Sequence, residues 1–210
     1  LENPMRKAVD VFGEWATKGK DEGMEKSHSI PVNEMLDFAL GEIHDEEKSF
    51  DFLDLGCGNG WVVRQMAQHT LCRKAFGIDG APEMIANAEY RGGNTDYILA
   101  DLNKYNPNVK YDLIHSMEVL YYLEDPFLLI EKIANSWLNL HGRLIVGIDH
   151  YHENQSSHSW QEKVGTRMLM FKEEEWIEAF TNSGLSQVKS WRANRSDDWE
   201  GTLVITGRKS

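Results

Sequence analysis

Cysteine is scarce in this chain: only two of the 210 residues, Cys57 and Cys72, are cysteines. Two thiols cannot supply the disulfide framework that stabilises many small secreted domains. We therefore interpret both as reduced thiols, which is typical of a cytoplasmic protein.

Long hydrophobic runs are also absent. No segment approaches the ~20 consecutive apolar residues that a membrane-spanning helix needs, so we expect no membrane span. The start of the chain, Leu1 to Lys7, has neither the apolar segment of a secretory signal nor an initiator Met. We interpret it as a cloning remnant or a trimmed end.

Basic residues are also few relative to acidic ones. The chain has 22 Lys and Arg residues against 34 Asp and Glu residues, which gives a net charge of −12. Proteins that bind nucleic acid over a broad surface need basic residues to neutralise phosphates. The composition therefore argues against a nucleic-acid partner, although it leaves room for a small basic pocket.

What the chain does contain is a glycine-rich corner between a strand and a helix. Apolar residues within 50–55 predict a strand, Gly56, Gly58 and Gly60 follow at alternate positions, and a helical pattern covers 61–69. Glycine tolerates positive φ and lets the backbone approach a ligand closely. Such a corner is the ligand-binding point of an open parallel α/β sheet, so we expect a nucleotide-like cofactor there.

The glycine spacing narrows the choice of cofactor. The dinucleotide fingerprint needs a small residue three positions after its second glycine, and Trp61 occupies that position here. A phosphate-binding P-loop needs Lys followed by Ser or Thr after its last glycine. The chain has no such pair there, so the sequence gives no support to nucleoside triphosphate binding.

The other patterns alternate between strands and helices, which favours βαβ units and a mostly parallel sheet. We expect further strands over 75–79, 96–100, 111–116, 142–148, 188–193 and 202–207, with the last two forming a hairpin. We expect helices over 5–20, 29–40, 61–69, 81–89, 126–138 and 173–183. Residues 18–28 are expected to be irregular, Pro31 to lie in the first turn of its helix, and 149–170 to form a long functional or mobile loop.

Residues Asp54 to Gly60, Asp-Leu-Gly-Cys-Gly-Asn-Gly, resemble motif I of the class I S-adenosylmethionine-dependent methyltransferases. In that family the acid that ends the second strand binds the cofactor ribose, and Asp79 stands at that place. The family's acid after the third strand, which meets the adenine amino group, is matched by Asp101. Ser116 to Leu123 is similar to the small-molecule form of motif IV. The resemblance covers residues 45–208.

The resemblance implies an α/β fold with a doubly wound, seven-stranded, mostly parallel sheet. The implied strand order is 3-2-1-4-5-7-6, with the last strand antiparallel and helices on both faces. It implies one domain over 1–210, made of an N-terminal helical cap (1–44) and a Rossmann-like core (45–210). The cofactor would be S-adenosyl-L-methionine, with S-adenosyl-L-homocysteine as its product. The cofactor-binding residues that it implies are Asp54, Gly56, Cys57, Gly58, Asn59, Gly60, Asp79, Gly80, Met84, Asp101, Leu102, Ser116 and Met117.

The implied activity is methyl transfer to a small molecule, on an oxygen, nitrogen or carbon atom that the sequence does not determine. The chain is most similar to the ubiquinone/menaquinone-biosynthesis-like group. The Asn/Asp-Pro-Pro-Tyr motif of adenine and glutamine N-methyltransferases is absent, because Ser116-Met-Glu-Val119 stands in its place. Both thiols lie in or just after the cofactor loop, which argues against arsenic-methylating and RNA-cytosine-methylating types.

The loop after the fifth strand is the expected acceptor region. We hypothesise that His150, Tyr151 or His152 serves as the base or as an orienting donor. The alternative is that these are solvated histidines beside a packed tyrosine. A metal set of suitable residue types can be drawn, but its spacing matches no metal motif, so we expect no metal. That set is Asp149, His150, His152, Glu153 and His158.

Several weaker assignments stay open. Glu25 and His28 could reach the methionine end of the cofactor or the acceptor, whereas Arg64 is expected to face solvent. Glu118 could supply the acid that metal-dependent catechol-type enzymes need after strand four. Two other functions are alternatives: a nicotinamide-dependent oxidoreductase, and a non-catalytic module that binds S-adenosylmethionine. The sequence does not decide between a monomer and a homodimer.

Overall fold

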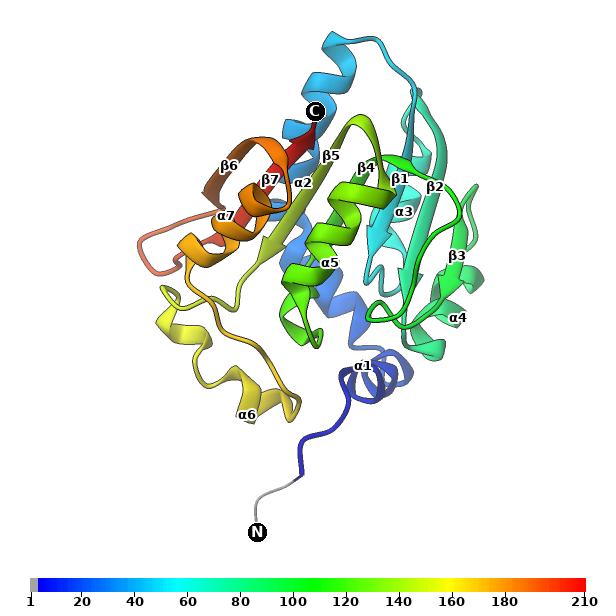
Figure 1. The fold of residues 1–210 in the computed structure, drawn as a ribbon. Coiled ribbons are helices and arrows are strands. Elements are labelled where there is room, and N and C mark those ends of the chain that lie inside the picture. Colours follow the sequence, from blue (N-terminus) through cyan, green and yellow to red (C-terminus); the bar gives the residue numbers. More distant parts are fainter. Residues whose placement is uncertain (1–3) are drawn as a thin grey trace.

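Seven strands form one sheet in the order β3-β2-β1-β4-β5-β7-β6 (Figure 1). The computed structural model describes residues 4–210. Strands β1 to β5 pair in parallel, whereas β7 runs antiparallel to both β5 and β6. The predicted strand order and the antiparallel last strand are therefore confirmed. The strands are β1 (Phe50–Leu55), β2 (Cys72–Asp79), β3 (Asp96–Leu99), β4 (Tyr111–Met117), β5 (Leu138–Ile148), β6 (Leu185–Ala193) and β7 (Thr202–Lys209).

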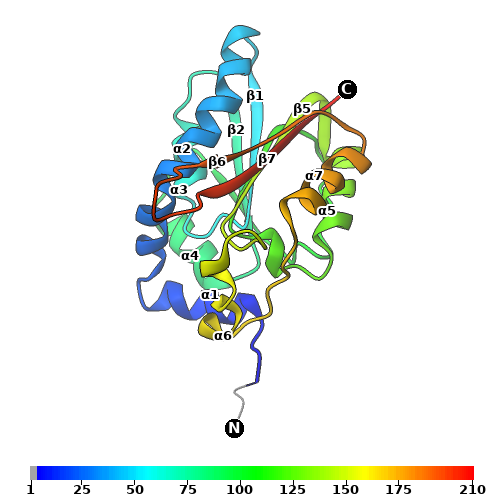
Figure 2. The same cartoon turned by 90° about the vertical axis from the view of Figure 1, so that its left-hand side faces the viewer.

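Helices cover both faces of the sheet, as predicted. Helices α2, α3 and α4 lie on one face, and α5 and α7 lie on the other (Figure 2). Helices α1 and α6 lie at the end of the sheet toward which the parallel strands point (Figure 1). The helices are α1 (Ala8–Thr17), α2 (Asp21–Asp45), α3 (Trp61–Ala67), α4 (Pro82–Tyr90), α5 (Pro126–Lys132), α6 (Trp160–Val164) and α7 (Glu173–Asn182).

The central strand β1 explains why the sheet needs helices on both sides. Phe50 and Phe52 pack into the core on the α2–α3 face, while Leu53 and Leu55 pack into the core on the α5–α7 face. All four side chains are buried, with at most 1% of their surface exposed. A parallel strand that is buried on both faces is expected to be mostly apolar, and four of the six residues of β1 are apolar, with Asp51 and Asp54 as the exceptions.

The N-terminal segment differs from the prediction. Residues 21–28 were expected to be irregular, but they form the first two turns of α2, and Pro31 lies inside that helix instead of in its first turn. An interior proline costs a helix about 3 kcal/mol because it lacks an N–H and clashes with the preceding turn. Burial of Pro31, Val32 and Met35 against the sheet offsets that cost.

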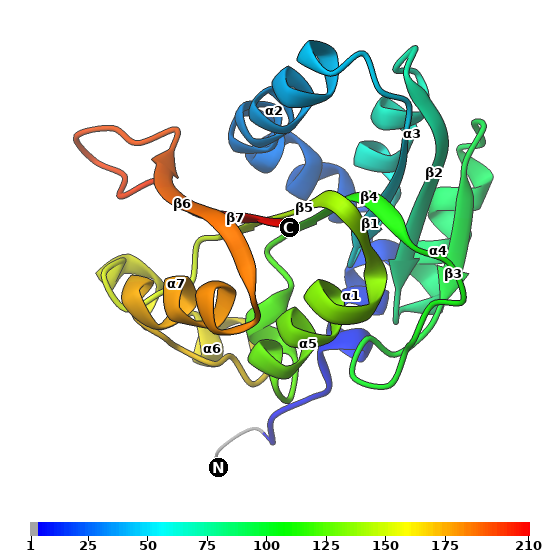
Figure 3. The same ribbon diagram turned by 45° about the horizontal axis from the view of Figure 1, so that its top comes forward.

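The stretch after β5 is also more regular than predicted. It contains the 3₁₀ turn η3 (Gln155–Ser157) and the short helix α6, while a second 3₁₀ turn, η1 (Leu120–Tyr122), follows β4. A π-helical turn, η2 (Ile133–Trp137), continues α5, and β5 begins four residues before its predicted start at 142. The hairpin connection 194–201 extends away from the sheet (Figure 3).

One of two expectations about targeting can be compared with the structure. Among residues 4–210, no helix combines the length and the apolar character needed to cross a membrane. The interpretation of residues 1–7 as a remnant or trimmed end stays untested, and residues 1–3 lie outside the described residues.

Candidate functional site

A cavity of about 880 Å³ lies at the carboxyl ends of the central parallel strands. Its walls come from the segments that follow β1, β2, β3, β4 and β5, and α1 and the first two turns of α2 lie across it. This is the edge at which open parallel α/β sheets bind their ligands. The volume is that of a typical small-molecule site.

The glycine corner forms one wall of the cavity. Gly56, Gly58 and Gly60 have φ angles of 66°, 53° and 78°, a region that other residues rarely adopt. A Cβ atom on Gly56 would collide with the side chain of Val119, and one on Gly60 would collide with the ring of Tyr97. The glycines therefore permit both the turn and the close packing around it.

Asp79, the last residue of β2, fixes the position of this corner. Its Oδ2 accepts a hydrogen bond from the Gly58 N–H at 2.9 Å, and its Oδ1 accepts one from the Ala81 N–H at 2.8 Å. Burial raises the pKa of Asp79, while these backbone bonds act in the opposite direction. Each carboxylate oxygen has two lone pairs, so Asp79 can still accept bonds from a ligand's hydroxyl groups.

A buried pair of polar residues lies beneath the glycine corner. Nδ1 of His115 on β4 lies 2.7 Å from Oδ1 of Asp54 on β1, and both residues line the cavity. Burial raises the pKa of Asp54, and the neighbouring imidazole opposes that rise. His115 Nε2 is buried without a hydrogen-bond partner, so it is free to bond a ligand or a water molecule. The sequence analysis did not identify His115 as a site residue. A histidine within an otherwise apolar strand could have indicated a buried polar contact.

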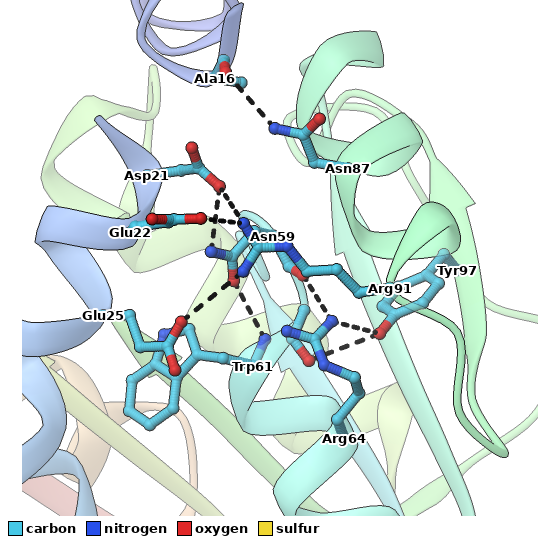
Figure 4. A network of polar contacts seen from close by, with 11 residues as sticks. Ala16, Asp21, Glu22, Glu25, Asn59, Trp61, Arg64, Asn87, Arg91 and Tyr97 are labelled. Atoms are coloured by element: carbon cyan, nitrogen blue, oxygen red, sulfur yellow. Dashed lines mark hydrogen bonds and ion pairs between the residues drawn. The ribbon is translucent and has the colours of Figure 1, made fainter. Parts of the chain in front are cut away.

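A polar network ties α2 to the glycine corner (Figure 4). Asp21, the first residue of α2, accepts a bond from the Asn59 side-chain amide at 3.0 Å and pairs with Arg91 at 3.3 Å. Asp21 is 2% exposed and lines the cavity, and its Oδ1 has no partner. Arg64, which was predicted to face solvent, instead donates to the Asn59 carbonyl at 2.6 Å.

That anchor also positions His28. Asp21, Met24 and His28 are separated by three and four residues, so they share one face of α2 and all line the cavity. His28 therefore enters the site because the helix begins eight residues earlier than the sequence pattern indicated.

Three titratable side chains gather at the ends of β4 and β5: His28, Glu118 and Asp149, which we call the acidic trio. One nitrogen or oxygen atom of each lies within 4.8 Å of the others. His28 Nε2 lies 3.9 Å from Asp149 Oδ2. Glu118 accepts the backbone N–H of Asp149 and the hydroxyl of Tyr121, and its own φ is 61°.

The acidic trio is electrostatically perturbed because Asp149 is buried and His28 and Glu118 are half-buried beside it. Burial raises the pKa of Asp149 to about 6, although the Thr202 hydroxyl, which donates to Asp149 Oδ1 at 2.6 Å, acts in the opposite direction. Burial, followed by the charge of Asp149, holds the pKa of Glu118 well above its usual range. Burial lowers the pKa of His28 to about 4. Perturbed groups gathered in one cavity are typical of a reactive centre.

Most of the expected cofactor residues come together in the cavity. Those that line it are Asp54, Gly56, Cys57, Gly58, Asn59, Asp79, Gly80, Met84, Asp101, Leu102 and Met117. Gly60 caps α3 instead, and the Ser116 hydroxyl donates to the Leu55 carbonyl within the sheet. Burial raises the pKa of the Cys57 thiol, which is therefore held in its neutral form.

The three expected catalytic residues are placed elsewhere. None of His150, Tyr151 and His152 is among the cavity-lining residues. His150 Nδ1 lies 3.1 Å from the Ser157 carbonyl, the buried Tyr151 hydroxyl donates to the Gly201 carbonyl at 2.8 Å, and His152 is exposed. Of the metal set drawn from this loop, only Asp149 lines the cavity. The three residues therefore do not line the cavity, although the His150 ring packs against Tyr121 and Trp160, which do.

Comparison with known proteins gives a consistent result. A family model described as a methyltransferase domain matches residues 7–190. Trans-aconitate 2-methyltransferase of Escherichia coli O7:K1 (strain IAI39 / ExPEC) is 31% identical over 131 residues, which are 62% of this chain and 47% of that protein. The chain spans less than half the length of the curated relatives it matches.

Solved structures share the fold over nearly the whole chain. A chain in the complex of the Haloferax volcanii Trm112 methyltransferase activator with a methyltransferase has a TM-score of 0.81 and 27% identity, with 97% of this chain and 98% of that chain covered. DhpI in complex with S-adenosyl-L-homocysteine has a TM-score of 0.71 and 20% identity, with 97% of this chain and 96% of that chain covered. The second likeness concerns the fold alone.

Proposed function

The chain belongs to the methyltransferase domain family, and we propose that the protein transfers the methyl group of S-adenosyl-L-methionine to a small-molecule acceptor. One observation carries this proposal: the cavity at the carboxyl edge of the sheet is lined by the glycine corner, by the acid that ends β2 and by the acid that follows β3. The two unpaired cysteines support a cytoplasmic location, which we also propose.

The residues of the site fit the cofactor. Gly56 and Gly58 line the cavity and offer a ligand backbone without side chains, and the Asp79 carboxylate lies beside them. We assign the cofactor ribose to Asp79 and the adenine to Asp101 and Leu102. When bound, S-adenosyl-L-methionine supplies a methyl group on a positively charged sulfur. The chain's own residues then have to position the acceptor and exclude water, since sulfur is already a good leaving group.

The first test is the substitution Asp79→Ala. It removes a charged hydrogen-bond acceptor from the ribose position and releases the Gly58 N–H. We expect S-adenosyl-L-homocysteine to bind more weakly by about 1–3 kcal/mol, measured by isothermal titration calorimetry. Asp96→Ala, at the exposed start of β3, is the matched control and should leave the affinity unchanged.

An unchanged affinity of the Asp79 variant would remove this residue from the site. Calorimetry tests the first rival function, and an assay of methyl transfer to a panel of acceptors tests the second. A nicotinamide-dependent oxidoreductase would bind NADH and not S-adenosyl-L-homocysteine. A non-catalytic module would bind S-adenosyl-L-homocysteine but would methylate no acceptor.

A second proposal concerns a protein partner. The structural neighbour from Haloferax volcanii is in a complex with the Trm112 activator, and we propose that a Trm112-type protein binds this chain along the β3 edge of the sheet. β3 is an edge strand, and Leu99 on it is 53% exposed. Tyr90 and Val109, in the segments before and after β3, are 92% and 54% exposed. An open strand edge with exposed apolar side chains favours pairing with another chain.

Co-purification tests this partner. The protein should co-elute in size-exclusion chromatography with the Haloferax volcanii Trm112 activator, and Leu99→Asp should weaken the complex at least about 10-fold, because it places a charge in an apolar contact. Leu128→Asp is the control, since Leu128 is 45% exposed on α5, at a distance from β3 in the sheet order. Separate elution of the two proteins, or an equal effect of both variants, would contradict the proposal.

A further inference from the structure

The cavity has two parts, and the second part carries an inference that rests on the proposed function. The cofactor positions belong mainly to β1, β2, β3 and the segments that follow them. The carboxyl ends of β4 and β5 carry Glu118 and Asp149, and His28 reaches them from α2. We infer that the acidic trio is the acceptor site, and that it binds an amine and removes one proton from it before the nitrogen is methylated.

The charge of this part of the cavity selects the class of acceptor. Asp149 is 7% exposed, and two carboxyl groups share one small volume with a single imidazole. Water screens buried charges poorly, so this end attracts an ammonium group and repels a carboxylate. A neutral hydroxyl gains nothing from the charge. The relative named for trans-aconitate, a carboxylate anion, therefore differs from this chain in acceptor class.

The positive side chains of the cavity do not reverse this preference. Arg6, Lys7, Lys104 and Arg167 also line the cavity, but all four are exposed. Arg6 is in addition paired with Glu14 at 2.7 Å. These cations therefore lie where solvent screens them, while the Asp149 carboxylate lies where it does not.

The walls beside the acidic trio also suit an organic cation. Tyr121, Tyr122, Trp160 and Met168 line the cavity, and the Tyr121 hydroxyl bonds to Glu118. Aromatic faces attract cations through their quadrupoles, and the attraction is stronger where water is excluded. The expected acceptor is thus an amine on an apolar or aromatic scaffold.

A metal ion is a poorer occupant of the acidic trio. Both oxygens of Glu118 accept hydrogen bonds, from the Asp149 N–H and the Tyr121 hydroxyl, and Asp149 Oδ1 accepts one from Thr202. Among the described residues, Asp149 Oδ2 and the His28 imidazole make no hydrogen bond, and His28 Nε2 lies 3.9 Å from Asp149 Oδ2. A metal ion would have to share the other three carboxyl oxygens with the donors that already bond to them, and the two unengaged groups are fewer than the ligands that a protein metal site provides. They are sufficient to hold one N–H group and accept its proton.

The transfer balances with the groups present. The bound ammonium gives one proton to the Asp149 carboxylate, with His28 as the neighbouring acceptor. The freed nitrogen lone pair forms a bond to the methyl carbon, and the carbon–sulfur bond breaks with its electron pair remaining on sulfur. The products are the methylated ammonium, S-adenosyl-L-homocysteine and one proton on the carboxylate, which passes to solvent.

The test uses three matched probes on protein saturated with S-adenosyl-L-homocysteine: 2-phenylethylamine, 2-phenylethanol and phenylacetate. Calorimetry should give at least 10-fold tighter binding of the amine than of the alcohol or the carboxylate. Asp149→Asn should lose that preference while it keeps the affinity for S-adenosyl-L-homocysteine. Glu178→Gln, an exposed carboxylate on α7, should keep both.

Each other outcome overturns the inference. Tightest binding of phenylacetate, equal binding of all three probes, or an undiminished preference in Asp149→Asn would remove the amine from the site. Binding of S-adenosyl-L-homocysteine without any amine-specific binding would do the same and would leave the proposed function intact. Failure of S-adenosyl-L-homocysteine itself to bind would instead contradict the proposed function.

Discussion

Asp149→Asn is expected to make the protein more stable and less active at the same time. Burial raises the pKa of this carboxyl group from 3.8 to about 6, so keeping it ionised at pH 8 costs the folded state about 3 kcal/mol. An Asn side chain carries no charge and can still accept the bond from Thr202. Urea unfolding at pH 8 should therefore show a gain of up to about 3 kcal/mol.

The activity should change in the opposite direction. The substitution removes the carboxylate that we propose takes the acceptor's proton, and general-base catalysis is worth about 100-fold to 10,000-fold. Release of S-adenosyl-L-homocysteine with the amine acceptor should fall by at least about 100-fold. When a site sacrifices stability to hold a reactive charge, removing the charge raises stability and lowers activity. Substitution of a residue with only a structural role would lower both stability and activity.

The stability gain of Asp149→Asn should depend on pH if it comes from removal of a buried charge. A carboxyl group whose folded-state pKa is raised favours folding when it is protonated, and this contribution is lost as the pH rises through about 6. The advantage of Asp149→Asn over the unchanged protein should therefore be full above pH 6 and should vanish as the pH falls toward 4. His28, whose pKa burial lowers to about 4, is present in both proteins and cancels to first order.

The control for this experiment is the exposed Asp197→Asn, which should alter neither stability nor activity measurably. A loss of stability in Asp149→Asn at pH 8, or a gain independent of pH, would contradict the assignment of a buried charge. Both results can be read from unfolding curves without knowledge of the natural acceptor.

His115→Leu is expected to cost about 3–5 kcal/mol of stability. His115 is fully buried, and its partner Asp54 is 3% exposed, so Leu leaves a buried carboxyl group without its imidazole. The double variant Asp54→Asn/His115→Leu removes that charge as well and should recover at least about half of the loss. Urea unfolding at pH 7 is the measurement.

The exposed His158→Leu is the matched control and should change stability by no more than about 0.5 kcal/mol. If the stability lost in the double variant equalled the sum of the losses in Asp54→Asn and His115→Leu, the two residues would not be energetically coupled. The pair would then be two separate core contacts.

The α/β architecture and the glycine corner could be predicted from local patterns. Phe50 to Leu55 form a strand because they are apolar on both faces, and the three glycines that follow can only be a turn that needs positive φ. The acids that end β2 and follow β3 stand at the carboxyl edge as a consequence of the parallel topology. Each of these features depends on residues that are close together in the sequence.

The N-terminal helix could not be predicted in the same way. Residues 18–28 are polar and contain two glycines, and Pro31 normally marks the first turn of a helix. The actual start of α2 is decided by distant partners, since Asp21 meets Asn59 of the glycine corner and Arg91 at the end of α4. The sequence gives no local signal for such contacts.

For this protein, local patterns in the sequence determined the alternation of strands and helices and the glycine corner, and the family resemblance predicted the strand order and the cofactor-binding residues. Our proposal for the acceptor site depends on the tertiary structure. It places the base in the acidic trio, whereas the sequence had suggested His150, Tyr151 or His152. His28 comes from α2, Glu118 from the end of β4 and Asp149 from the end of β5. The physical reason is that burial and mutual distance set their charge and reactivity, and both exist only once the chain is folded.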